Sequence, residues 1–157
     1  MRETSKIAFH WIVKLLRKQK IPFRVSGGLA ARAYGAKRPL ADIDLDVPDA
    51  ALYKLAHLVK KFKPLGPKHY IDSEWDVNYV EFYYKQQEIS LIGSDSQKIF
   101  NKNTTKWECF KIRLPENNKK LISGLIVPVI PKNDLISYKS KIRRKVDLID
   151  VTFLTRP

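Results

Sequence analysis

Cysteine is nearly absent from this chain: Cys109 is the only one among 157 residues. A single cysteine excludes a disulfide framework within the chain and a zinc site built from cysteines. The three histidines are scattered and have no spacing typical of zinc ligands. Cys109 lies in the largely apolar stretch KWECFKI, so we expect a buried structural thiol. Such low cysteine usage suits a reducing compartment.

Long apolar segments are also lacking. The longest, residues 121–131, is too short and too interrupted by proline to cross a bilayer. The N-terminal segment carries an acidic residue and no cleavage site after its apolar part, so we do not interpret it as a signal peptide. We therefore expect a cytoplasmic protein with no membrane partner.

Acidic residues are scarce relative to basic ones: 16 Asp and Glu stand against 30 Lys and Arg, which gives a formal net charge of +14. Such a positive field favours anionic partners, among them nucleotides, RNA, acidic proteins and anionic membrane surfaces. The alternative is a lysine-rich surface that serves only solubility.

Hydrophobic residues make up 44% of the chain, enough for one compact domain spanning residues 1–157. Helical periodicity predicts helices at residues 5–18, 29–35, 49–61, 131–142 and 145–154. Alternating or continuous apolar runs predict strands at residues 22–27, 41–47, 78–84, 87–93, 107–114 and 125–130. Because helices and strands do not strictly alternate, we expect an α/β or α+β fold, a mixed β-sheet with helices packed on it.

Local signals predict where several of these elements begin. Thr4 or Ser5 is the expected N-cap of the first helix, Asp49 that of the third and Asn133 that of the fourth. Residues 63–69, KPLGPKH, are rich in turn formers and predict a loop.

A row of carboxylates lies on the predicted strand ADIDLDV. Side chains alternate between the faces of a strand, so Asp42, Asp44 and Asp46 share one face. Three neighbouring aspartates repel one another in a shielded site, yet they can jointly hold divalent cations such as Mg²⁺. The alternative is a half-exposed strand whose polar face happens to be acidic.

A glycine pair precedes this strand, between a short strand and a helix. Gly27 and Gly28 let the backbone approach a phosphate closely, and Ser26 adds a hydroxyl. A glycine pair alone is also typical of an ordinary strand-to-helix turn. Together with the Asp-x-Asp strand, it predicts a phosphate cradle beside a metal site.

Residues 25–49 read VSGGLAARAYGAKRPLADIDLDVPD. A glycine pair at a helix start, followed by Asp-x-Asp on the next strand, resembles the signature of the nucleotidyltransferase superfamily, which includes DNA polymerase β. The chain is similar to its small single-domain members, such as lincosamide and toxin–antitoxin nucleotidyltransferases. The likeness covers most of the chain, but only residues 27–47 are specific.

The resemblance implies transfer of a nucleoside monophosphate from an NTP to a hydroxyl, with release of pyrophosphate and with Mg²⁺, bound as two ions, as cofactor. It implies that Gly27 and Gly28 contact the triphosphate. It also implies that Asp42 and Asp44 are metal ligands and catalytic residues.

The family's third carboxylate, a metal ligand or the general base, corresponds best to Glu88 in QEISLIG. Glu81 on the preceding strand is the rival. Many relatives have Asp where this chain has Glu, which leaves the geometry open. Asp46 lies beyond the usual pair and is either an accessory ligand or the partner of a basic residue.

Two basic residues match positions that face the nucleotide in similar proteins. Arg38 lies in the loop before the aspartate strand, and Lys139 on the fourth helix. Each is an expected nucleotide-binding residue, with a solvated surface charge as the alternative. We expect Asp147 and Asp150 to be structural and to pair with the basic residues 143–145.

The sequence thus predicts a metal-dependent nucleotidyltransferase that binds ATP or another NTP. Similar proteins suggest a small hydroxylated acceptor, the net charge suggests RNA such as tRNA, and a protein acceptor is a third option. The alternative function is a non-catalytic nucleotide- or RNA-binding protein on the same fold. The intact pair of Asp42 and Asp44 argues against that alternative.

Overall fold

A curled, mixed β-sheet forms the centre of the molecule in the computed structural model, which describes residues 1–114 and 118–157. Within these residues the sheet has nine strands, in the order β7-β6-β4-β5-β2-β1-β9-β8, with β3 paired to β4. The strands are β1 (Arg24–Val25), β2 (Asp42–Val47), β3 (Leu65–Ile71), β4 (Trp75–Tyr84), β5 (Gln87–Gly93), β6 (Lys98–Asn101), β7 (Lys106–Cys109), β8 (Asn118–Ile122) and β9 (Leu125–Val129). The predicted fold class is confirmed.

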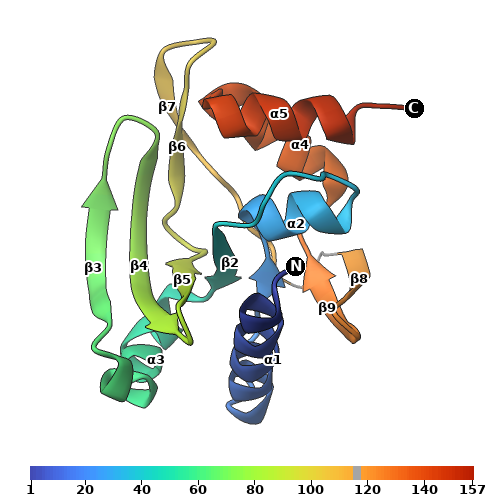
Figure 1. The fold of residues 1–157 in the computed structure, drawn as a ribbon. Coiled ribbons are helices and arrows are strands. Elements are labelled where there is room, and N and C mark those ends of the chain that lie inside the picture. The colour runs from blue at the N-terminus through green and yellow to red at the C-terminus, as the bar shows by residue number, and fades with distance from the viewer. Residues whose placement is uncertain (115–117) are drawn as a thin grey trace.

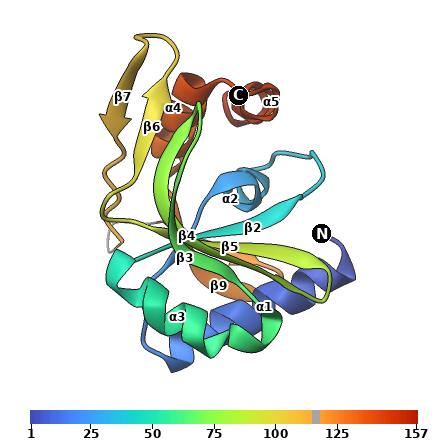
Figure 2. The ribbon, with the colours of Figure 1, turned by 90° about the vertical axis from the view of Figure 1, so that its left-hand side faces the viewer.

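Helices cover both faces of the sheet (Figures 1 and 2). One face carries α1 and α3, and the other carries α2, α4 and α5. The helices are α1 (Glu3–Lys18), α2 (Gly27–Ala33), α3 (Leu52–Leu58), α4 (Lys132–Ile142) and α5 (Lys145–Leu154). None of the helices in the described part of the chain is long and apolar enough to cross a membrane.

The strand β2 separates the core from the acidic face, as its alternation predicts. Ile43, Leu45 and Val47 are fully buried in the hydrophobic core on the side of α1 and α3. The aspartates between them therefore point to the opposite face, toward α2, α4 and α5. Burying three branched side chains contributes roughly 1.5–3 kcal/mol each, which fixes the register of the strand.

The predicted loop at residues 63–69 is wrong in part, because Leu65–Ile71 forms β3. Most of its side chains are exposed, so the strand carries no hydrophobic alternation that the sequence could reveal. It is held by antiparallel pairing with β4.

The expected N-caps are also wrong. The N-cap positions are Arg2 in α1 and Pro131 in α4, and neither side chain makes a cap bond. Ser5 instead donates a hydrogen bond of 2.5 Å to Gln87 Oε1. Asp49 makes no cap bond, because its carboxylate accepts hydrogen bonds from residues 78, 95 and 96.

Cys109 is exposed, which corrects the expected buried thiol. The predicted strand at residues 107–114 is instead the shorter β7, Lys106–Cys109. It lies at the end of the sheet order and pairs only with β6 within the described residues, so an apolar stretch here does not imply burial.

Candidate active site

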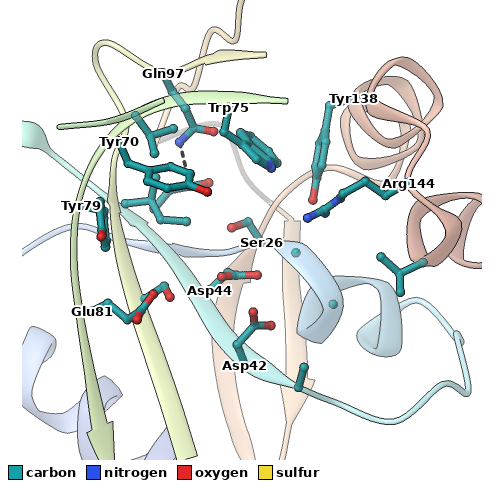
Figure 3. A pocket seen from close by; sticks show the side chains of 18 of the residues that line it. Ser26, Asp42, Asp44, Tyr70, Trp75, Tyr79, Glu81, Gln97, Tyr138 and Arg144 are labelled. Atoms are coloured by element: carbon teal, nitrogen blue, oxygen red, sulfur yellow. Dashed lines mark hydrogen bonds between the residues drawn. The ribbon is translucent and has the colours of Figure 1, made fainter. Parts of the chain in front are cut away.

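A cavity of about 580 Å³ opens on the acidic face of the sheet. Its floor is formed by β2, β4 and β5, and its sides by the start of α2 and by residues of α4 and α5. Figure 3 shows Asp42 and Asp44 at its centre, with Glu81 on one side and Arg144 on the other. All eight residues that the sequence analysis singled out line this cavity: Ser26, Gly27, Gly28, Arg38, Asp42, Asp44, Glu88 and Lys139.

The parallel pairing of β2 and β5 brings the acidic residues together. Asp42 is in register with Glu88, and Asp44 with Ser90. Neighbouring strands lie about 4.8 Å apart, so Asp42 and Glu88 are direct neighbours on one face. Glu81 on β4 is in register with Ser90, which places it two strands from Asp44, about 10 Å across the sheet.

Glu88 is additionally held by Tyr83. The Tyr83 hydroxyl donates a hydrogen bond of 2.6 Å to Glu88 Oε2. Glu81 receives no hydrogen bond that the described residues show. Both glutamates nevertheless line the cavity, so either can be the third carboxylate.

Asp44 lies directly against the glycine pair. A Cβ atom on Gly27 would collide with the Asp44 carboxylate, and Gly27 has φ +58°, a conformation that other residues rarely adopt. A Cβ on Gly28 would lie 2.7 Å from Arg38 Nη2. The glycines are therefore required where the backbone, a carboxylate and a guanidinium meet.

The surroundings of Asp42 and Asp44 disfavour their ionisation. Burial raises the pKa of Asp44 to about 8, and the charges of Asp42 and Asp46 add to this rise. Burial and the neighbouring Glu88 also raise the pKa of Asp42. Such carboxylates gain most from a cation brought close to them.

Asp46 is different, because it already has a partner. Arg24 on β1 is in register with Asp46 and donates a hydrogen bond of 2.7 Å to its Oδ2. Both side chains are 2% exposed. Burial raises the pKa of Asp46, and the Arg24 charge opposes that rise. Of the two expected alternatives, pairing with a basic residue is the one that the structure shows.

Arg38 is anchored by the last helix. Its Nε and Nη2 donate hydrogen bonds of 2.7 and 2.9 Å to the two oxygens of Asp150. This bidentate bond, with a smaller opposing effect of burial, raises the pKa of Arg38. The anchored guanidinium lies beside Gly28 at the edge of the cavity.

Lys139 is buried, so the alternative of a solvated surface charge is wrong. Its Nζ lies 3.0 Å from both Asp147 Oδ1 and Asp150 Oδ2, and it is 1% exposed. Burial lowers the pKa of Lys139, but its interactions with Tyr138, Asp147 and Asp150 outweigh that effect, so the pKa is raised overall. Asp147 also pairs with Arg144, as expected from its position, at 2.7 Å. The pairing expected for Asp150 is wrong, because its carboxylate is bound by Arg38 and Lys139 and not by residues 143–145.

The cavity also has an aromatic part, whose members come from four separate segments and for which core packing is the default expectation. They are Tyr70, Trp75, Tyr79, Phe110 and Tyr138. Trp75 and Tyr79 belong to a strand pattern in which aromatic residues normally fill the core. No local signal distinguishes a core ring from one that lines a cavity.

Among the described residues, no group of three or more His, Cys, Asp or Glu side chains is arranged to hold a metal ion. Mg²⁺ in phosphoryl-transfer sites often takes only one or two carboxylates and completes its shell with water and substrate phosphates. The carboxylates that share this face of the cavity are Asp42 and Asp44, with Glu88 beside Asp42.

No family model and no curated protein matches the chain. Several solved structures, in contrast, match it in fold. A proposed nucleotidyltransferase from Thermotoga maritima, TM1012, superposes with a TM-score of 0.69 over 88% of this chain and 85% of that one, at 15% identity. The lincosamide antibiotic adenylyltransferase LnuA, in its lincomycin-bound structure, gives a TM-score of 0.63 over 93% of both chains, also at 15% identity. ANT(2″)-Ia, in complex with adenylyl-2″-tobramycin, gives 0.65 over 96% of this chain and 87% of that one, at 16% identity. The chain therefore has the fold of the nucleotidyltransferases that the glycine pair and the Asp-x-Asp strand predicted.

Proposed function

We propose that this chain, as a single domain, is a nucleotidyltransferase. It moves a nucleoside monophosphate from an NTP to an acceptor hydroxyl and releases pyrophosphate. The observation that carries the proposal is the contact between Gly27 and Asp44, with Asp42 beside Glu88 on the same face. Two glycines, which have no side chain, thus lie in one cavity with carboxylates for which the described residues show no ion pair.

The donor set fits hard divalent cations. Asp42 and Asp44, with Glu88 as the third ligand, would hold Mg²⁺. The bound ions would neutralise charge on the triphosphate and stabilise the attacking and leaving oxygens. The raised pKa values of Asp42 and Asp44 support this assignment, because an unpaired carboxylate in a shielded site gains from such a cation.

The other side of the cavity suits the phosphates. Gly27 and Gly28 allow close approach of the phosphate oxygens to the backbone, and Ser26 lines the same wall. Arg38 and Lys139 supply positive charge, held in place by Asp150. A guanidinium fixed through two of its nitrogens binds phosphate at a smaller loss of conformational entropy than a mobile one.

The chemical step is an in-line displacement. The acceptor oxygen forms a bond to the α-phosphorus, and the bond from that phosphorus to the bridging oxygen breaks. Pyrophosphate leaves with the electron pair. The hydroxyl proton passes to a carboxylate, for which Glu88 is the first candidate and Glu81 the second, since a general base must lie within hydrogen-bond reach of the hydroxyl.

The acceptor is a small hydroxylated molecule. Glu81 on β4 and Glu88 on β5 line the cavity, and their negative charges would repel an RNA backbone there. The cations Arg38, Lys139 and Arg144 are all paired with aspartates of α5. Two proteins of the same fold have small-molecule names in their descriptions, LnuA with lincomycin and ANT(2″)-Ia with adenylyl-tobramycin.

The test is transfer from labelled NTPs with Mg²⁺. We would offer lincomycin, tobramycin and total tRNA as acceptors and measure labelled product and pyrophosphate. We expect the wild type to form labelled product on a small molecule. We expect Asp44→Asn to lower the rate of transfer at least about 10³-fold, because a metal ligand is removed. Asp134→Asn, an exposed aspartate on α4 outside the cavity, is the matched control and should retain full activity.

Two results would overturn parts of the proposal. NTP binding without transfer to any acceptor would favour the non-catalytic alternative. Product on tRNA alone would reject the small-molecule assignment while keeping the transferase.

A further inference from the structure

One half of the cavity, the aromatic half, is lined mainly by rings, and its two carboxylates are already hydrogen-bonded, Asp46 to Arg24 and Asp72 to the Tyr70 hydroxyl. Tyr70, Trp75, Tyr79, Phe110 and Tyr138 contribute aromatic rings to this half. Two edge-to-face contacts connect three of them, with Tyr138 centred 5.8 Å from Trp75 and 5.1 Å from Phe110. Burial raises the pKa of Tyr138 to about 12, so its phenol stays neutral at physiological pH.

Gln97 is the polar side chain at this end. It is 4% exposed, and in Figure 3 it reaches from the rim between Tyr70 and Trp75 toward the interior. Its Nε2 lies 3.4 Å from both Asp46 Oδ1 and the Gly93 carbonyl oxygen. Both distances exceed the usual 2.9–3.0 Å of such bonds, so the amide is weakly held and can exchange these contacts for a ligand.

Strand register separates the two halves. Asp42 and Glu88 are paired at one end, whereas Asp46 is paired with Ile92, and Ile92 with Tyr79, at the other. Four residues along a strand span about 13 Å. The aromatic half therefore begins about 7 Å along the strand from Asp44 and about 13 Å from Asp42, the range that a nucleoside attached to the α-phosphate spans.

We propose that the aromatic half binds the nucleobase of the donor NTP and that Gln97 reads its edge. The inference rests on the proposed function, which fixes the α-phosphate at Asp42 and Asp44 and the leaving pyrophosphate at α2. The acceptor hydroxyl must reach Glu88 or Glu81, so the acceptor occupies the acidic side. The nucleoside then extends toward the aromatic rings.

The ligand chemistry is a purine, and adenine in particular. Aromatic rings stack on any base, and each stacked base typically contributes about 1–3 kcal/mol. Gln97 offers one donor and one acceptor, which match the adenine N7 and N6 amino group; guanine presents two acceptors there, a pattern that suits arginine instead.

Binding of ATP, GTP and inorganic tripolyphosphate, each with Mg²⁺, tests the proposal by calorimetry. We expect the wild type to prefer ATP over GTP by about 10-fold. Gln97→Met should reduce that preference to about 2-fold and leave tripolyphosphate affinity unchanged. Trp75→Leu should weaken ATP and GTP alike, by about 10-fold, again without effect on tripolyphosphate. Thermal melts verify that each variant is folded.

Tryptophan fluorescence gives a second readout with a matched control. ATP should quench the wild type and Trp107→Leu, in which an exposed ring outside the cavity is removed. Trp75→Leu should lose the quenching, and tripolyphosphate should quench none of the three proteins.

The outcomes separate this inference from the function itself. If tripolyphosphate binds but ATP affinity is the same in wild type, Gln97→Met and Trp75→Leu, the base subsite is wrong and the nucleotidyltransferase proposal survives. If neither tripolyphosphate nor ATP binds, both fail.

Discussion

Asp44 and Asp46 lie two residues apart on the same face of β2, yet we predict that the change from Asp to Asn has opposite effects on stability at the two positions. Asp44 faces like charges, and its pKa is raised to about 8. Asp46 forms a buried ion pair with Arg24. The pair of variants is therefore a matched experiment within one strand.

The magnitude for Asp44 follows from its protonation. At pH 7 the unfolded carboxyl, with an ordinary pKa of 3.8, is ionised, whereas the folded one is mostly protonated. Between pH 3.8 and pH 7, each pH unit corresponds to about 1.36 kcal/mol. Keeping the folded carboxyl protonated therefore lowers the free energy of unfolding by up to about 4 kcal/mol at pH 7. Burying the asparagine amide offsets part of this gain. We expect Asp44→Asn to add about 2 kcal/mol to the free energy of unfolding, which raises Tm by about 4–8 °C.

The magnitude for Asp46 follows from its partner. Asp46→Asn leaves the Arg24 guanidinium buried without a counter-charge, which typically costs about 3–5 kcal/mol. Arg24 Nη2 is already a buried atom with no hydrogen-bond partner among the described residues. We expect Tm to fall by about 10 °C.

Thermal melts of the metal-free protein between pH 4 and 9 are the assay. Because the pKa of folded Asp44 is raised, its contribution to stability is greatest below pH 4 and is lost as pH rises toward 8. The advantage of Asp44→Asn should therefore grow over this interval and then level off. A lower Tm for Asp44→Asn at pH 7, or a higher one for Asp46→Asn, would refute the reasoning.

Three further predictions concern other parts of the chain. Arg38→Ala and Asp150→Asn should each weaken tripolyphosphate binding by about 10-fold, and the double variant should be no weaker than the worse single one because the two residues act as one unit; additive losses would contradict this coupling. Gly27→Ala should lower Tm more than Gly124→Ala, because both have positive φ but only Gly27 has a carboxylate in the space of the new methyl; equal losses would leave backbone strain as the only cause. Cys109 should react with a thiol reagent in the native protein within minutes, and a thiol that reacts only in denaturant would show that it is buried.

Much of the site could be predicted because it depends on local patterns. The glycine pair and the alternating aspartates are each readable within a few residues, and β2 presents them as its alternation requires. The hairpin of β4 and β5 was also predictable, since two apolar runs flank a two-residue turn. Glu88 was indicated by the resemblance to the nucleotidyltransferases, whereas the parallel pairing of β2 with β5 that sets it beside Asp42 has no local signal.

Partners from distant segments could not be predicted. The strand that carries Arg24 has only two residues, so the register that places it opposite Asp46 has no sequence signal. Lys139 looks like a surface lysine on its helix, and its burial depends on two aspartates that α5 supplies. Ion pairs between elements require the tertiary arrangement, which periodicity does not encode.

The bond between Arg38 and Asp150 has a consequence for the order in which the protein folds. The two residues are 112 positions apart in the chain, and contacts of such high sequence separation form slowly because a long loop must close first. The glycine pair and the aspartates of β2 are close in sequence and can meet earlier. A folding intermediate with β1 and β2 paired, but with α5 undocked, would carry the carboxylates without the anchored cations beside them. The cations of the proposed phosphate site, Arg38 and Lys139, are both held by Asp150, so they are anchored only once α5 has docked.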